Sequence, residues 1–161
     1  GSNTCYISPE TGLTWLADKP YTKGSWGYIG GKEEATLTQI KGVNDNPLYQ
    51  SVRVMPEMYR FDVPAGEYEV ELLFADIFGT GASIAHTLGI TGEKSQTINS
   101  FDIIINGSVI DSDVSLDDSV GKYYAVRKKY IVKSEKGENI TIQFRNISGS
   151  SFINGLKLRV L

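Results

Sequence analysis

The segment Glu67–Phe74 (EYEVELLF) alternates polar and apolar residues almost without exception. Its apolar positions with a period of two are Tyr68, Val70, Leu72 and Phe74. Successive side chains of a β-strand point to opposite faces, so these four rings and aliphatic chains would share one face and the glutamates the other. The pattern predicts a strand with one dry face and one wet face, as in an antiparallel sheet.

Segments of the same kind lie on both sides of this strand. The other predicted strands cover residues 48–54, 58–63, 101–105, 108–110, 123–132, 139–144 and 152–161. Asn106-Gly107 separates two apolar runs and predicts a type I′ hairpin, because both central residues of that turn need a positive φ. No window repeats with the helical period of 3.6. Short strands between turn signals predict an all-β domain, a jelly-roll β-sandwich.

Two segments lack this alternation. Asp18–Gly31 is rich in Gly, Pro, Trp and Tyr, and we expect it to be irregular. Gly79–Ser100 is predicted to be a long loop insertion, and loops of about 20 residues are usually functional or partly ordered. We expect residues 1–161 to form a single domain, with Gly1-Ser2 left over from a purification tag.

Composition excludes several classes of partner. The 161 residues carry a net charge of −3, so no basic excess is available to neutralise the phosphates of a nucleic acid. No apolar run approaches the length needed to span a bilayer, and no membrane partner is expected. The chain has one cysteine, which cannot form an internal disulfide.

Residues for catalysis or metal binding are sparse. His86 is the only histidine, and no Gly-x-Ser-x-Gly motif is present, so no catalytic residue is expected. Asp111, Asp113, Asp117 and Asp118 cluster in sequence, as ligands of Ca²⁺ do, but without the spacing of an EF-hand. A solvated acidic loop is the favoured interpretation over a calcium site. We therefore expect neither a metal nor a cofactor.

The aromatic residues Trp26 and Tyr28 are the most informative feature. They lie in Lys23–Gly31 (KGSWGYIGG), whose glycines predict a loop that cannot bury them deeply. A flat ring can cover the C–H face of a sugar while neighbouring polar groups bind its hydroxyls. The alternative is that Trp26 folds back as a cover on the edge of the sandwich, and the sequence leaves both interpretations open.

Several segments, in the same order, resemble the malectin and malectin-like domains. They are Asn46–Arg53, Tyr59–Tyr68, Val70–Asp76, Phe101–Gly107 and Phe152–Lys157. The opening Leu13–Gly31 looks more specifically like the malectin-type modules appended to bacterial family 2 glycoside hydrolases. The resemblance implies a jelly-roll sandwich of the galactose-binding-domain-like kind.

The resemblance also implies positions for a sugar site. In malectin, aromatic residues that follow the Phe-Ala-Asp strand cradle the sugar, and here Phe78 takes the first of these places and Gly79 the second. Trp26 or Tyr28 could supply the aromatic residue of the early loop. Val54 stands where another aromatic residue is usual, so the constellation is incomplete and a different glycan is possible.

These observations predict a non-catalytic carbohydrate-binding module of a larger secreted bacterial glycoside hydrolase that is β-galactosidase-like. We expect a periplasmic or extracellular location, with an oligo- or polysaccharide and the parent catalytic domain as partners. The predicted sugar-stacking residues are Trp26, Tyr28 and Phe78, and the predicted hydroxyl ligands are Arg53, Asn154 and Asp76. The alternative is a structural domain that packs against its parent enzyme and binds no sugar.

Overall fold

The computed structural model describes residues 1–78, 98–116, 120–135 and 139–161. In these residues, helical structure is confined to one 3-10 turn, η1 (Asn46–Leu48). The strands are, in chain order, β1 (Tyr6–Ile7), β2 (Thr14–Trp15), β3 (Trp26–Ile29), β4 (Lys32–Ala35), β5 (Ser51–Val54), β6 (Met58–Phe61), β7 (Gly66–Phe74), β8 (Ser100–Ile105), β9 (Ser108–Ser115), β10 (Val126–Ser134), β11 (Ile140–Ser148), β12 (Phe152–Ile153) and β13 (Gly155–Val160).

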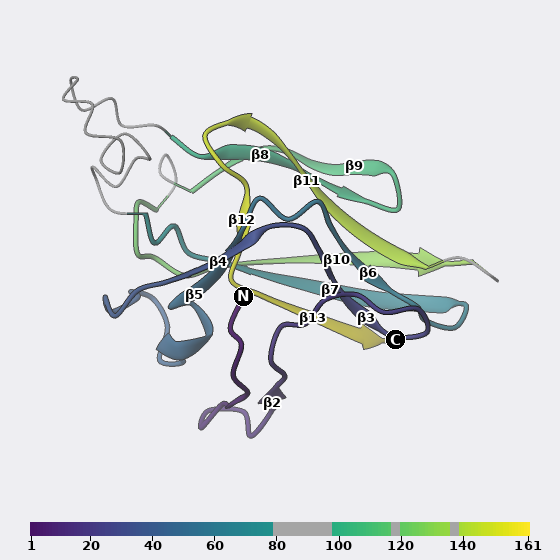
Figure 1. Ribbon diagram of the computed structural model, residues 1–161, viewed down its shortest axis with the longest axis horizontal. Coiled ribbons are helices and arrows are strands. Elements are labelled where there is room, and N and C mark those ends of the chain that lie inside the picture. Colours follow the sequence, from purple (N-terminus) through teal and green to yellow (C-terminus); the bar gives the residue numbers. More distant parts are fainter. Residues whose placement is uncertain (79–97, 117–119, 136–138) are drawn as a thin grey trace.

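Two antiparallel sheets form the body of the domain. One has the order β3-β6-β11-β8-β9 and the other the order β10-β7-β13. A third sheet, β12-β5-β4, extends alongside them, and β1 and β2 form a small pair near the N-terminus (Figure 1). This arrangement confirms the predicted all-β sandwich, and β7 is the middle strand of its sheet.

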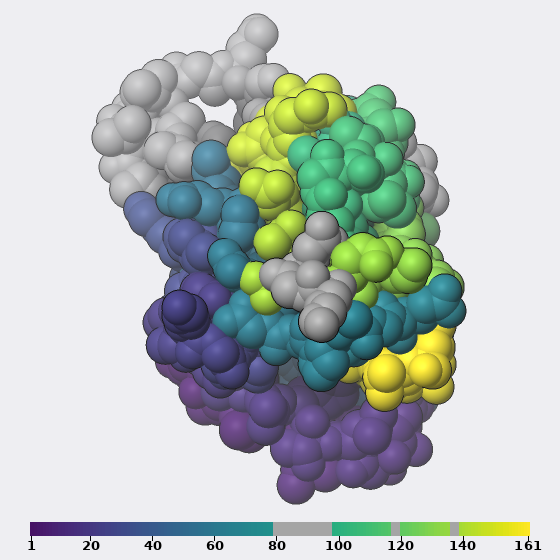
Figure 2. All heavy atoms as spheres, turned by 90° about the vertical axis from the view of Figure 1, so that its right-hand side faces the viewer, coloured from purple at the N-terminus to yellow at the C-terminus, as the bar shows by residue number. Residues whose placement is uncertain are grey.

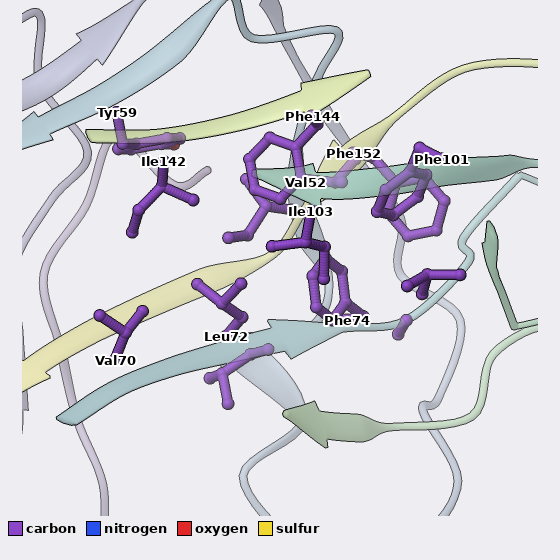
Figure 3. Packing of buried hydrophobic residues seen from close by; sticks show 14 of the residues in the cluster. Val52, Tyr59, Val70, Leu72, Phe74, Phe101, Ile103, Ile142, Phe144 and Phe152 are labelled. Atoms are coloured by element: carbon purple, nitrogen blue, oxygen red, sulfur yellow. The ribbon is translucent and has the colours of Figure 1, made fainter. Parts of the chain in front are cut away.

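The core lies where the inner faces of the sheets meet. Four phenylalanines form its centre, with ring centroids 5.6–6.4 Å apart in mostly edge-to-face pairs: Phe74, Phe101, Phe144 and Phe152 (Figure 3). Edge-to-face contacts suit aromatic rings because the positive rim of one meets the negative face of another. The inward positions predicted for β7, from Tyr68 to Phe74, are all buried.

The predicted hairpin is confirmed. Asn106 and Gly107 both have positive φ, 50° and 77°, as a type I′ turn between β8 and β9 requires. The side chain of Asn106 also accepts a hydrogen bond from the N–H of Thr141 at 3.0 Å. The turn therefore anchors β8 to its other neighbour, β11.

The prediction of an irregular segment was wrong for residues 26–29, which form the edge strand β3. The physical reason is visible at Gly27. A Cβ there would lie 2.5 Å from the carbonyl oxygen of Lys19 and from backbone atoms of Pro20 and Tyr21. The glycine permits the backbone of residues 19–21 to pass against β3, where Tyr28 donates its N–H to the Lys19 carbonyl at 2.9 Å. It marks a close approach of two segments and not a turn.

The ends of other predicted strands differ as well. Residues 46–48 form η1 before β5 begins at Ser51, and the single strand predicted for 152–161 is split into β12 and β13. The two halves pair with different strands: β12 with β5, and β13 with β7. The chain changes sheets at Asn154, which a pattern of alternation in one strand cannot reveal.

Candidate functional site

Trp26 and Tyr28 lie on the inner face of β3, each beside an aromatic residue of β6. Trp26 stacks on Phe61 with an interplanar angle of 8° and a centroid distance of 6.1 Å. Tyr28 meets the ring of Tyr59 edge-on at 6.5 Å. Both β3 rings remain partly exposed.

Arg53 covers Tyr28. Its guanidinium carbon lies 3.3 Å from the centre of the Tyr28 ring, and its Nε donates to Asp18 at 2.6 Å. Tyr59 donates its hydroxyl to the same Asp18 oxygen at 2.9 Å. Burial, followed by the charge of Asp18, strongly raises the pKa of Tyr59, so this hydroxyl stays protonated and keeps its role as donor. Tyr28 and Arg53, two of the predicted sugar ligands, therefore lie in contact. Arg53 also forms a buried ion pair with Asp18.

Asp76 and Phe78 lie together in a second place. The carboxylate of Asp76 accepts hydrogen bonds from the N–H of Phe78 at 2.9 Å and from Asn99 at 2.9 Å, and Lys122 lies 3.2 Å away. The ring of Phe78 packs edge-on against Phe152 at 5.6 Å. Asp76 is therefore almost fully buried and bonded to protein groups.

Asn154 is buried between these two places. Its Oδ1 accepts the N–H of Ala75 at 2.8 Å, and its Nδ2 donates to the carbonyls of Tyr49 at 2.7 Å and Ser51 at 3.1 Å. Both ends of the amide are engaged by backbone groups. These bonds join η1 and β5 to the end of β7, at the point where the chain changes sheets.

The three predicted stacking rings do not form one surface in the described residues. Tyr28 packs on Arg53 and Tyr59, and Phe78 packs on Phe152. The prediction for residue 79 and the interpretation of His86 lie outside the described residues. Of the three rings, Trp26 alone lines the large cavity described next.

A cavity of about 740 Å³ lies beside Trp26. Its walls come from the N-terminal segment 1–16, from β3 and β6, and from the edge strand β13. The edge strands β3 and β13 of the two sheets both border this cavity. The N-terminal segment lies beside β13 on this part of the molecule (Figure 2). The apolar wall includes Trp15, Trp26, Phe61, Leu156 and Leu158.

Polar groups stand among these apolar walls. Ser25, Asp62 and Lys157 line the cavity, and the Lys19 ammonium lies 4.7 Å from the centre of the Trp26 ring while donating to Ser25 at 2.9 Å. The hydroxyl of Tyr21 lowers the pKa of Asp62, which keeps this carboxylate ionised as an acceptor. Apolar pockets with a few convergent polar groups are typical of small-molecule sites of roughly 300–1,000 Å³.

Sequence reasoning missed Trp15 as a member of this wall. It lies in β2, whose two residues pair with β1, and it packs against the core from the N-terminal segment. The sequence holds two tryptophans, and both line the cavity. The signal available in the sequence was that both tryptophans lie before residue 30.

The interpretation of a solvated acidic loop was wrong for Asp111 and Asp113, which lie in the strand β9. Asp111 accepts from Lys128 and from the hydroxyl of Tyr130, both at 2.8 Å, and so ties β9 to β10. Asp117 and Asp118 lie outside the described residues. Across the described ranges, no three His, Cys, Asp or Glu side chains are grouped as a metal site would need.

None of the helical segments described could cross a membrane.

Residues 1–156 match the sequence profile of the malectin domain. The chain belongs to the malectin domain family. Among solved structures, this malectin domain is similar to β-glucuronidase 2 of Bacteroides uniformis covalently bound to cyclophellitol-6-carboxylate aziridine, at 43% identity and a TM-score of 0.86, over 100% of this chain and 17% of that one. A second Bacteroides uniformis β-glucuronidase structure is 42% identical with a TM-score of 0.84, over 99% and 18% of the two chains.

More distant structures share the fold alone. The ANX1 ectodomain of Arabidopsis thaliana is 17% identical with a TM-score of 0.64, over 96% of this chain and 44% of that one. Among curated proteins, none matches the chain. The malectin domain spans less than a fifth of the length of the bacterial β-glucuronidases that it resembles.

Proposed function

We propose that this malectin domain is a non-catalytic accessory module of a larger bacterial glycoside hydrolase, and that it binds carbohydrate in the cavity beside Trp26. The observation that carries the proposal is the cavity wall, where the indoles of Trp15 and Trp26 stand next to Ser25, Asp62 and Lys157. Indole faces match the C–H face of a pyranose, and the polar groups match its hydroxyls.

The other predicted ligands have supporting roles in this proposal. Arg53 and Tyr28 form the layer next to Trp26, and Asn154 lines the cavity although its amide is bonded to backbone. Asp76 and Phe78 would belong to a separate part of the binding face, beyond β12. The proposal includes a periplasmic or extracellular location, as the resemblance to secreted glycoside hydrolases suggests.

Intrinsic fluorescence tests this site directly, since both tryptophans of the chain line the cavity. A panel of neutral and glucuronate-terminated disaccharides should shift or quench the emission of the wild-type domain. Trp26→Phe keeps the fold through a ring of similar kind and should weaken binding about tenfold, in line with the loss of an aromatic anchor. Tyr124→Phe, a change at an exposed ring that does not line the cavity, is the matched control.

A flat emission signal across the panel, together with equal retention of wild type and Trp26→Phe on immobilised glycans, would contradict sugar binding in this cavity. Binding that Trp26→Phe leaves intact would place the sugar elsewhere on the domain.

A second candidate function is that the domain packs against its parent enzyme without binding sugar. Leu13 and Leu16 favour it, because these apolar side chains of the N-terminal segment are exposed at the cavity wall, and Ile7 of the same segment is also exposed. Tight association of the domain with the remaining enzyme, weakened by Leu16→Ser and unaffected by any glycan of the panel, would support this function over the first.

A further inference from the structure

The outer face of the sheet β10-β7-β13 carries a ladder of charges. Glu71 of β7 lies 4.0 Å from Arg127 of β10 and 3.9 Å from Lys157 of β13. One step along β7, Glu69 lies 3.8 Å from Lys129 and 3.3 Å from Arg159. Each carboxylate on the middle strand therefore stands between two cations on the flanking strands.

The side chains of the four cationic residues are more exposed to solvent than those of the two glutamates. The side chains of Arg127, Lys129, Lys157 and Arg159 are 47%, 55%, 34% and 57% exposed, whereas those of Glu71 and Glu69 are 7% and 16% exposed. A molecule that approaches this face meets four cationic groups first. We refer to these four residues as the cationic ladder, whose charge with the two glutamates is net positive by two.

The recessed carboxylates do not use up the donors of the ladder. Three of the four ion pairs join atoms 3.8–4.0 Å apart, which is beyond hydrogen-bonding distance. The cationic ends of these pairs are one-third or more exposed, so their N–H groups remain accessible to a ligand above the recessed carboxylates. Arg127 is the exception, since its Nε donates to the buried Tyr49 hydroxyl at 2.9 Å.

The cations of the ladder form two rows, one on each side of β7. Strands lie about 4.8 Å apart, so the cations of β10 and β13 form two rows about 10 Å apart on either side of β7. Ile131, 62% exposed, lies on β10 after Lys129, in register with Glu69, and offers an apolar contact at the end of the β10 row. An extended polyanion with alternating C–H and acidic groups fits two such rows.

We propose that the cationic ladder is a second, electrostatic docking surface, and that it binds acidic polysaccharide. The positive charge of the ladder favours an anionic polymer as its ligand. This positive surface lies on a domain whose net charge is −3. The choice of a sugar polymer rests on the proposed function of the domain. The surface shares Lys157 with the wall of the tryptophan cavity but differs from the cavity in mechanism, because it depends on charge and not on stacking.

The test is fluorescence polarisation with labelled oligogalacturonate, at about 10 mM and about 150 mM ionic strength, where the Debye length is about 30 Å and 8 Å. Wild-type domain should bind the labelled polymer, with affinity falling as salt rises. Lys129→Gln/Arg159→Gln should weaken binding about three- to tenfold, the effect expected of two exposed charges. Glu69→Gln should strengthen it, since it removes a competing carboxylate.

The control variant Lys23→Gln/Lys32→Gln removes the same charge from two exposed lysines outside the ladder and should leave binding unchanged. Equal losses in both double variants, or binding that ignores salt, would overturn the proposal. Equal binding of a short DNA duplex would overturn the assignment to polysaccharide. Trp26→Phe should retain oligogalacturonate binding, so that failure of the cavity proposal and failure of this one are told apart.

Discussion

The Nδ2 of Asn99 donates to Oδ2 of Asp76 at 2.9 Å, and the other oxygen of Asp76 accepts the N–H of Phe78 at 2.9 Å. One buried carboxylate therefore binds residues on both sides of positions 79–97. Lys122 adds an ion pair at 3.2 Å from a third segment. The charge of Asp76 is compensated inside the protein, which makes it a structural centre for this end of the sandwich.

Asp76→Ala should destabilise the domain by about 3–5 kcal/mol, because it leaves the buried donors of Phe78 and Asn99 without their acceptor and removes the ion pair with Lys122. Urea unfolding followed by tyrosine and tryptophan emission measures the change. Glu135→Ala is the control, since its pair with Lys133 is exposed and should be worth less than about 1 kcal/mol. A loss for Asp76→Ala no larger than that of the control would show that the carboxylate is not a structural centre.

Asn154→Ala should cost about 2–4 kcal/mol, because the N–H of Ala75 and the carbonyls of Tyr49 and Ser51 lose their partner in a buried place. Asn154→Asp should be at least as severe, since a carboxylate would face two carbonyl oxygens. Urea midpoints of both variants test this, with exposed Asn44→Ala as a control expected within about 0.5 kcal/mol of wild type. Equal stability of wild type and Asn154→Asp would contradict the assigned bonds.

The buried pair of Arg53 and Asp18 should be strongly coupled. Each of Arg53→Met and Asp18→Asn should cost about 3 kcal/mol by leaving the other charge unpaired. The double variant should cost less than the sum of the two, with a coupling energy of about 1–3 kcal/mol. A thermodynamic cycle from urea unfolding measures this coupling, and strict additivity would refute it.

The domain should lose stability in acid. The N–H of Asp113 and the guanidinium of Arg145 lower the pKa of Asp102, and the Tyr21 hydroxyl lowers that of Asp62. Because these folded-state pKa values lie below those of the unfolded chain, the unfolded chain binds more protons. The stabilisation is present above the ordinary carboxyl pKa of about 4 and is lost as pH falls through the lowered values.

Urea midpoints recorded from pH 7 down to about pH 3 measure this loss, in the range where carboxylates take up protons. Asp102→Asn should be less stable at neutral pH and should show a shallower decline in acid. A decline with the same slope in Asp102→Asn and wild type would assign the acid sensitivity to other groups.

The local pattern predicted most of the sandwich and part of the site. Alternation identified β7 and its buried face, and Asn106-Gly107 identified the hairpin, because both depend on backbone rules within a few residues. Trp26 was predicted to stack on sugar and lies on the cavity wall, but the glycines around it were interpreted as a loop. Gly27 serves a close approach of residues 19–21, and such a contact has no signature in local sequence.

The sequence by itself determined most of the strands after residue 50, the inward face of β7, the turn at Asn106 and the membership of the malectin domain family, since these depend on periodicity and on motifs in order. Only the tertiary structure decided that the last strand is divided at Asn154, that Trp15 joins Trp26 on one cavity wall, and that Glu69 and Glu71 lie below the cations of neighbouring strands. Those relationships depend on the pairing of segments far apart in the chain, where the position of a side chain is set by its neighbours in space.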